Sequence, residues 1–261
     1  SYGTMEPSLE YGGSAGNLNY YLTGTYLQNS FGIEPPTAAA TTLHDVTKQT
    51  RGFTYLSYML QPGTQVGLMA GHFLGNFQIP NIAGETPAYP IPGVTSPPSA
   101  DINENQREVN DYGVLFAQGL SGSMSWQVSL FDRYSSVHYY PDPIADLVYN
   151  GVSSQVLRRS LATGLQADMS YATTEAHTLR WGVFVQHEHT SSDNTAAVFS
   201  ADANGNPMST TPLTVIDNTA KNGAFYSAYI EDQWLPVTAL TLNYGLRYDL
   251  NDGYAREDKL S

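Results

Sequence analysis

The sequence predicts an all-β protein, built from antiparallel hairpins that form part of a transmembrane β-barrel. The first observation is a period of two in hydrophobicity, which recurs along the chain and is typical of strands with one apolar face. The second is a regular exchange of tight turns and long connections between these strands. The third is composition: charged residues are only 13% of the chain, about half of the usual share. We therefore expect much of the surface to face something other than water.

The clearest hairpin spans residues 224–249, with a turn at 236–239. Its second arm alternates apolar Leu242 and Leu246 with polar Asn243 and Arg247. The apolar side of its first arm is formed by Tyr226, Ala228, Ile230 and Trp234. Because an isolated hairpin is marginally stable in water, this pair requires further strands beside it.

The rest of the chain supplies four more hairpins. In chain order, we expect strands at 8–13 and 18–28, 52–60 and 66–73, 109–119 and 124–134, and 157–171 and 178–188. Tight turns near positions 15, 62, 121 and 175 join them, and Gln-Pro-Gly-Thr at 61–64 has typical turn chemistry. The strand at 124–134 shows the pattern well, since Trp126 and Leu130 oppose Gln127 and Ser129. The total is about ten strands.

Long connections are expected at 30–46, 78–106, 135–155 and 189–222, and a polar tail at 251–261. The prolines of 78–106 exclude a central strand there. Compact soluble domains rarely repeat structureless loops of this length. Outer-membrane barrels, in contrast, have short turns on one side and long loops on the other.

Aromatic residues mark both ends of these strands. Trp126, Trp181 and Trp234 lie near the tight turns on apolar faces, together with Tyr171. Tyr26, Tyr134, Tyr226 and Tyr248 lie toward the opposite ends. Two such rows are typical of the girdles at the two membrane interfaces. The opposite face carries Asp168, Arg180, Glu231 and Arg247, which suit a water-filled or plugged lumen. A soluble sandwich or propeller is the alternative, but it leaves the loop asymmetry and the tryptophans unexplained.

Composition excludes several classes of function. The net charge of −13 argues against nucleic acid as a partner. The chain has no cysteine, so it has no disulfide, thiolate metal site or cysteine nucleophile. It has no apolar run of the length of a transmembrane helix. Residues 1–20 do not read as a signal peptide, so an exported protein would have this chain as a mature or excised piece.

Several stretches resemble the barrel region of TonB-dependent receptors. AYIEDQWLPVTALTLNYGLRYD at 228–249 is similar to a strand pair that recurs in that family. HTLRWGVFVQHEHTSSDN at 177–194 resembles the hairpin before it, and 11–37 with 73–81 resembles early barrel strands. The resemblance covers nearly the whole chain.

The resemblance implies a 22-stranded barrel with a plugged lumen, of which residues 1–261 would be one internal part. We expect the plug with its TonB box, and the C-terminal strands, to be absent from this chain. The implied function is active transport across the Gram-negative outer membrane of a scarce ligand, such as a siderophore or another metal chelate. The implied partners are the TonB–ExbB–ExbD complex, reached through the plug, that ligand, and outer-membrane lipid. A passive porin or substrate-specific channel is the alternative, and a barrel enzyme or adhesin is a third hypothesis.

Candidate site residues follow from position. Tyr139, Tyr140 and Tyr149 in an outer loop could stack on a ligand, or simply pack on each other. Arg180, Glu231 and Arg247 are expected to face the lumen or plug. His187 and His189 share one strand face, but two ligands without a third do not make a metal site, so we expect no metal and no cofactor. No nucleophile elbow is present, so we expect no catalytic residues and no enzyme.

Overall fold

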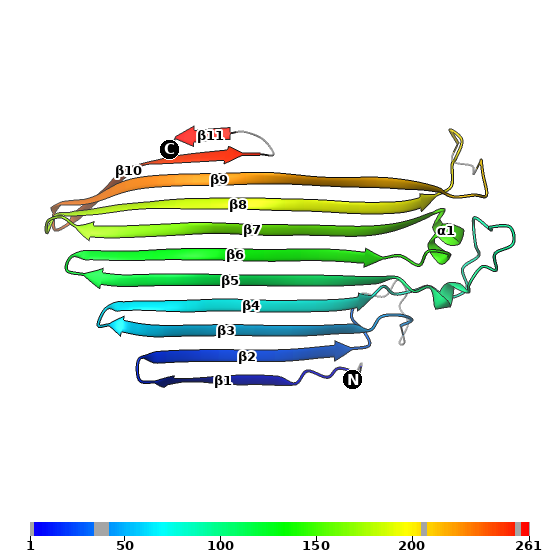
Figure 1. The fold of residues 1–261 in the computed structure, drawn as a ribbon, viewed down its shortest axis with the longest axis horizontal. Coiled ribbons are helices and arrows are strands. Elements are labelled where there is room, and N and C mark those ends of the chain that lie inside the picture. The colour runs from blue at the N-terminus through cyan, green and yellow to red at the C-terminus, as the bar shows by residue number, and fades with distance from the viewer. Residues whose placement is uncertain (1–2, 34–41, 205–207, 254–256, 261) are drawn as a thin grey trace.

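The computed structural model describes residues 3–33, 42–204, 208–253 and 257–260, and these form one antiparallel sheet. Each of the eleven strands pairs with its neighbours in chain order (Figure 1). The strands are β1 (Ser8–Ala15), β2 (Leu18–Asn29), β3 (Thr47–Gln61), β4 (Thr64–Gln78), β5 (Asn105–Ser121), β6 (Met124–Tyr140), β7 (Val152–Ala172), β8 (His177–Val198), β9 (Leu213–Val237), β10 (Leu240–Asp252) and β11 (Glu257–Leu260). Within the described residues β1 and β11 do not pair, so the sheet is open rather than closed.

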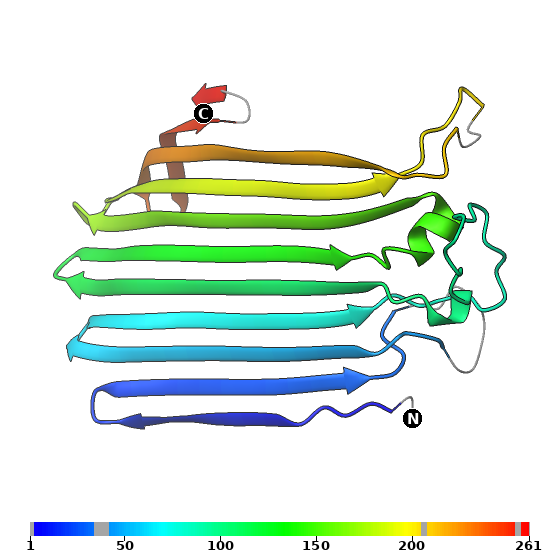
Figure 2. The ribbon, with the colours of Figure 1, turned by 45° about the vertical axis from the view of Figure 1, so that its right-hand side comes forward.

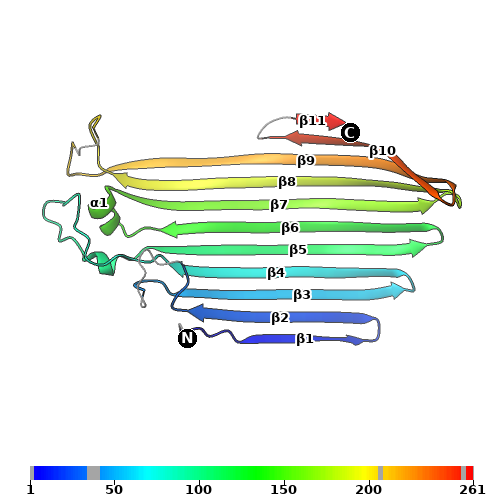
Figure 3. The same ribbon diagram turned by 180° about the vertical axis from the view of Figure 1, so that it is seen from behind.

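Short turns and long connections lie at opposite ends of the sheet (Figure 2). We call them the turn end and the loop end. The turn end holds the connections 16–17, 62–63, 122–123, 173–176 and 238–239. The loop end holds 30–46, 79–104, 141–151 and 199–212, including the 3-10 helix η1 (Ser99–Asp101) and the helix α1 (Ala145–Asn150). The view from behind shows the same order of strands (Figure 3). The expected asymmetry is confirmed.

Several strands are longer than the sequence pattern predicts. The segment 135–155 is not one long connection, because β6 continues to Tyr140 and β7 begins at Val152. Likewise, β8 continues to Val198 and β9 begins at Leu213, so the loop between them is only 199–212. The predicted tail at 251–261 is also partly wrong, since β11 pairs with β10. The extensions of β8 and β9 carry polar side chains on both faces, so they lack the alternation on which the prediction rests.

The register defines two faces of the sheet. Leu130 pairs with Leu165, and Val183 with Ala228, so these residues share one side, which we call the apolar face. The apolar face also carries one continuous row of residues that pair across neighbouring strands. In strand order these are Trp126, Met169, Trp181, Ile230 and Leu246. The polar face is the other side, where Gln127 pairs with Asp168 and Arg180 pairs with Glu231. The tryptophans therefore lie on the apolar face near the turn end, as predicted.

The sheet has almost no water-excluded core. The buried apolar residues among those described are Ala145, Leu147, Val148 and Ala162, of which three belong to α1. Large side chains of the apolar face are exposed instead, including Leu130 at 51% and Leu246 at 61%. Exposed apolar surface of this extent marks a face that contacts something other than water. No described helix is both long enough and apolar enough to cross a membrane.

Candidate functional site

A cluster of charged and polar side chains lies on the polar face, near the turn end of β8 and β9. Arg180 Nη1 donates to Glu231 Oε1 at 3.1 Å, and Arg180 Nη2 donates to Gln233 Oε1 at 2.7 Å. The two ionic side chains are about 40% exposed. Water therefore reaches this ion pair, which can exchange partners with an approaching polar segment.

A second group of hydrogen bonds lies beside this ion pair. The Tyr229 hydroxyl donates to Asp168 Oδ1 at 2.9 Å, and Gln166 Nε2 donates to Asp168 Oδ2 at 2.7 Å. Tyr229 lies over Gly182, where an added Cβ would be 2.4 Å from the tyrosine ring. The missing side chain at Gly182 thus positions Tyr229 against Asp168.

A hollow of about 560 Å³ joins these groups to the earlier strands. Its lining includes Gln118 on β5, Gln127 on β6, and Asp168, Arg180 and Tyr229. Arg247 lies on the same face and donates from Nε to both carboxylate oxygens of Asp249, at 3.0 and 2.9 Å. The predicted trio of Arg180, Glu231 and Arg247 therefore shares one face, but Arg247 has a carboxylate partner of its own.

An aromatic row crosses the polar face above this cluster. Phe184 on β8 stacks on Phe131 with ring centroids 5.5 Å apart and meets Phe225 at 5.9 Å. Tyr55 and Phe116 stack at 6.1 Å on the earlier strands. The polar face therefore also carries stacked aromatic rings. The available signal was the set of glycines beside the rings, because space for a ring requires a residue without a side chain on the next strand.

The structure separates the three candidate tyrosines at the loop end. Tyr139 lies on the polar face and Tyr140 on the apolar face, since they are consecutive in β6. Tyr149 belongs to α1, and its hydroxyl donates to the carbonyl of Pro97 at 2.9 Å. Tyr139 therefore shares the polar face at the loop end, Tyr140 lies on the other face, and Tyr149 is bound to the segment before η1.

Acidic residues surround Tyr139. Asp146 in α1 is 4% exposed, and its Oδ1 has no hydrogen-bond partner among the described residues. Burial, and then the adjacent carboxylate of Glu104, raise the pKa of Asp146 to about 8. Burial and the same two carboxylates raise the pKa of Tyr139. At neutral pH Asp146 therefore holds a proton that it can share with Glu104, which ties α1 to the residue just before β5.

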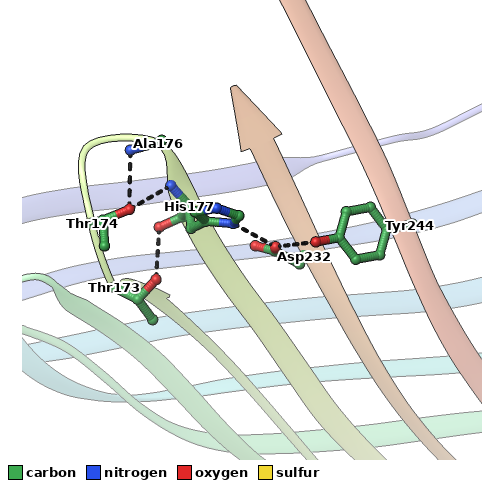
Figure 4. A network of polar contacts seen from close by, with 6 residues as sticks. All are labelled: Thr173, Thr174, Ala176, His177, Asp232 and Tyr244. Carbon is green, nitrogen blue, oxygen red and sulfur yellow. Dashed lines mark hydrogen bonds and ion pairs between the residues drawn. The ribbon is translucent and has the colours of Figure 1, made fainter. Parts of the chain in front are cut away.

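A further network on the apolar face at the turn end was not anticipated from the sequence (Figure 4). Asp232 Oδ2 lies 2.7 Å from His177 Nδ1 and accepts a hydrogen bond of 2.7 Å from the Tyr244 hydroxyl. The His177 ring is parallel to that of Trp234, with centroids 5.8 Å apart. Thr174 Oγ1 accepts from the backbone N–H of His177 at 3.1 Å and so fixes the turn. An acidic residue inside an apolar alternation was the available signal.

Metal ligands do not converge in the part of the chain that the structure describes. His187 and His189 share the apolar face, but His189 Nδ1 lies 2.7 Å from Asn222 Oδ1. Glu188 projects to the other face, where it accepts a hydrogen bond of 2.6 Å from Ser160. The three consecutive side chains are therefore divided between the two faces.

Comparison with known proteins identifies the fold. No family profile and no curated protein matches the chain. The siderophore receptor PiuA from Acinetobacter baumannii matches over 98% of this chain and 44% of its own, with a TM-score of 0.60 and 13% identity. The ferripyoverdine receptor of the outer membrane of Pseudomonas aeruginosa matches over 100% and 38%, with a TM-score of 0.65 and 14% identity.

The ferric citrate transporter FecA matches over 100% of this chain and 38% of its own, with a TM-score of 0.61 and 13% identity. The sheet has the fold of a TonB-dependent receptor barrel. It spans less than half of the length of each of these structures. These structures are of receptors and a transporter rather than of enzymes.

Proposed function

We propose that this chain is part of the barrel wall of an outer-membrane, TonB-dependent receptor that imports a scarce ligand, such as a siderophore or another metal chelate. The observation that carries this proposal is the match of 98–100% of the chain to siderophore and ferric citrate receptor barrels. The exposed apolar face, with tryptophans near the turn end, supports a membrane placement. The turn end then faces the periplasm and the loop end faces the outside.

The polar face lines the lumen in this proposal. Its ion pair of Arg180 and Glu231 is half-exposed, as a contact surface for a plug requires. Arg247 lies on the same face and would face the plug beside them. The plug would be supplied by another part of the polypeptide, and the TonB–ExbB–ExbD complex would act on it from the periplasm. The barrel wall itself performs no chemistry, so no cofactor is required.

Ligand capture would occur at the loop end. Tyr139 lies there beside the acidic residues Glu104 and Asp146, and Tyr149 lies in α1, bound to Pro97. Such a surface favours a neutral or cationic chelate over a polyanionic one, because the negative charge that Glu104 and Asp146 share at neutral pH repels an anion at short range. Tyr140 lies on the opposite face, so we assign it no part in this capture.

Uptake by the full-length protein tests the proposal. Cells that carry or lack the gene would be supplied with radioactive iron as ferric citrate, a hydroxamate chelate or a catecholate chelate. We expect uptake of one chelate that requires both this gene and an intact TonB complex. Equal uptake with and without the gene for every chelate would overturn the assignment of the ligand class.

Conductance separates this proposal from a passive porin. A receptor whose lumen is plugged should not conduct steadily in a planar bilayer, whereas an open channel should. Steady conductance of the full-length protein, together with uptake that does not depend on TonB, would favour the porin.

A further inference from the structure

A row of polar residues crosses the apolar face at the loop end. The register places Lys48, Asn76, Arg107 and His138 directly opposite one another on β3, β4, β5 and β6. Neighbouring strands are about 4.8 Å apart, so the Cα atoms of Lys48 and Arg107 are separated by about 10 Å. Their long side chains can therefore meet over the shorter Asn76.

The surface is hollowed where this row lies. A hollow of about 560 Å³ is lined by Lys48, Asn76, Gln78, Arg107 and Tyr140, among others, and no carboxylate is part of its lining. This is unusual in a chain with a net charge of −13. Within the described residues, Lys48 and Arg107 form no ion pair, in contrast to Arg159 with Asp193. Two cations that have no ionic partner among the described residues therefore line one concave site.

Additional positive charge lies beside the row. Burial, and then the positive charges of Arg107 and Arg159, lower the pKa of His138, which shows that both arginines act on this position. His138 Nε2 is 2.8 Å from Gln155 Nε2, and its ring lies 3.8 Å from that of Tyr140. The imidazole thus packs against the Tyr140 ring, at a tilt of 32°, next to the two cations.

The hollow lies just beyond the apolar part of its face. Arg107 is fourteen residues from Ser121, the last residue of β5 at the turn end. A tilted strand crosses the hydrocarbon core with about 9–11 residues, so Arg107 lies at the level of lipid headgroups. The contact of His72 Nδ1 with Asp111 Oδ1 at 2.5 Å is on the same face, four residues closer to the turn end on β5. This contact shows that polar residues already occupy the apolar face between the hydrocarbon level and Arg107.

We propose that this hollow binds the phosphorylated sugar headgroup of a glycolipid in the outer leaflet. Lys48 and Arg107 would bind a phosphate, because guanidinium and ammonium groups are the usual phosphate donors. The amides of Asn76 and Gln78 would bind sugar hydroxyls, and Tyr140 offers a ring on which a sugar can lie. The apolar surface that continues toward the turn end would contact acyl chains, which a free phosphate lacks. The inference rests on the outer-membrane placement proposed above.

Binding of diphosphoryl lipid A to the purified full-length protein in detergent micelles tests this site. The test variant is Lys48→Gln with Arg107→Gln. The matched control is Arg51→Gln with Arg133→Gln, which removes two cations from the polar face of β3 and β6. We expect the test variant to bind at least about tenfold more weakly and the control to bind as the wild type does. Heat-dependent migration in gels confirms that each variant is folded.

Two results would overturn the proposal. One is unchanged lipid A binding by the folded Lys48→Gln/Arg107→Gln variant. The other is equal affinity for lipid A and its dephosphorylated form, or full displacement of lipid A by excess inorganic phosphate. Uptake by the same variant keeps this test separate from the proposed function. If uptake persists while lipid A binding is lost, the site is supported independently, and if lipid A binds but no chelate is imported, only the transport proposal fails.

Discussion

Two consecutive carboxylates on β9 show how the faces of the sheet differ. Glu231 lies on the polar face and has Arg180 as its ionic partner. Asp232 lies on the apolar face and is contacted by both His177 and Tyr244, and the ring of Trp234 stacks on His177. The side chain of Glu231 is 39% exposed and that of Asp232 only 17%. The carboxylate of Glu231 is therefore exposed to water, whereas that of Asp232 is shielded at the edge of an apolar surface.

The comparison teaches that each face tolerates a different kind of change. In the proposed membrane placement, a charge on the polar face is solvated by water in the lumen, so its partners are replaceable. In the same placement, a charge on the apolar face must be fully hydrogen-bonded or lie beyond the hydrocarbon, because lipid offers no partner. Mutations at matched positions on the two faces can test this difference directly.

The largest expected effect comes from a charge placed in the centre of the apolar face. Val183 is 43% exposed there, and Val183→Arg should lower the free energy of unfolding by about 2–4 kcal/mol in a bilayer. Gln186→Arg, three residues further along β8 on the polar face, should cost much less. Denaturant titration of the full-length protein in lipid vesicles measures both. Equal costs would contradict the assignment of the two faces.

A side chain added under Tyr229 should have the next largest effect. In Gly182→Ala the new Cβ would lie 2.4 Å from the Tyr229 ring and 2.8 Å from the carbonyl of Ala167. Because backbone cannot move aside easily, we expect a loss of about 1–3 kcal/mol. Gly24→Ala on the apolar face is the control, since its nearest atom would be 3.9 Å away. If Gly182→Ala left the free energy of unfolding unchanged, the position of Tyr229 over Gly182 would not contribute to stability.

The loop end adds a dependence on pH. Since the pKa of Asp146 is raised to about 8, the folded loop holds more protons than the unfolded loop between pH 4 and 8. The packing of α1 should therefore weaken as the pH rises through this range. Proteolysis within residues 141–151 should become faster by up to roughly tenfold for each pH unit within this range. Asp146→Asn should remove the change, whereas Asp101→Asn in η1 should retain it.

The sequence predicted the hairpins wherever one face of a strand is apolar. The arms at 124–134 and 224–249 show this, because each apolar residue there alternates with a polar one. It could not predict how far β8 and β9 extend, since beyond the apolar zone both faces are polar. Aromatic pairs such as Phe131 and Phe184 were missed because stacking depends on cross-strand register, which one sequence does not specify. Asp232 was missed because its partners His177 and Tyr244 come from two other strands.

Removal of one hydrogen bond from the Asp232 network should have a smaller effect. Tyr244→Phe deletes the 2.7 Å bond to Asp232 and should cost about 1 kcal/mol. Tyr248→Phe is the control on the same strand and face, because its hydroxyl has no hydrogen bond among the described residues. If the two variants are equally stable in denaturant titrations, the network does not shield Asp232 as we infer.

The smallest effect is expected at the ion pair of the polar face. Arg180→Gln leaves Glu231 in water, and an exposed pair of this kind contributes about 0.2–1 kcal/mol. A double-mutant cycle with Glu231→Gln measures the coupling, which salt should weaken. A larger coupling free energy that salt does not weaken, measured in the full-length protein, would mean that water is excluded from this ion pair. In that case, deletion of the plug should return the coupling to the small value, because the plug would be the element that excludes water from this face.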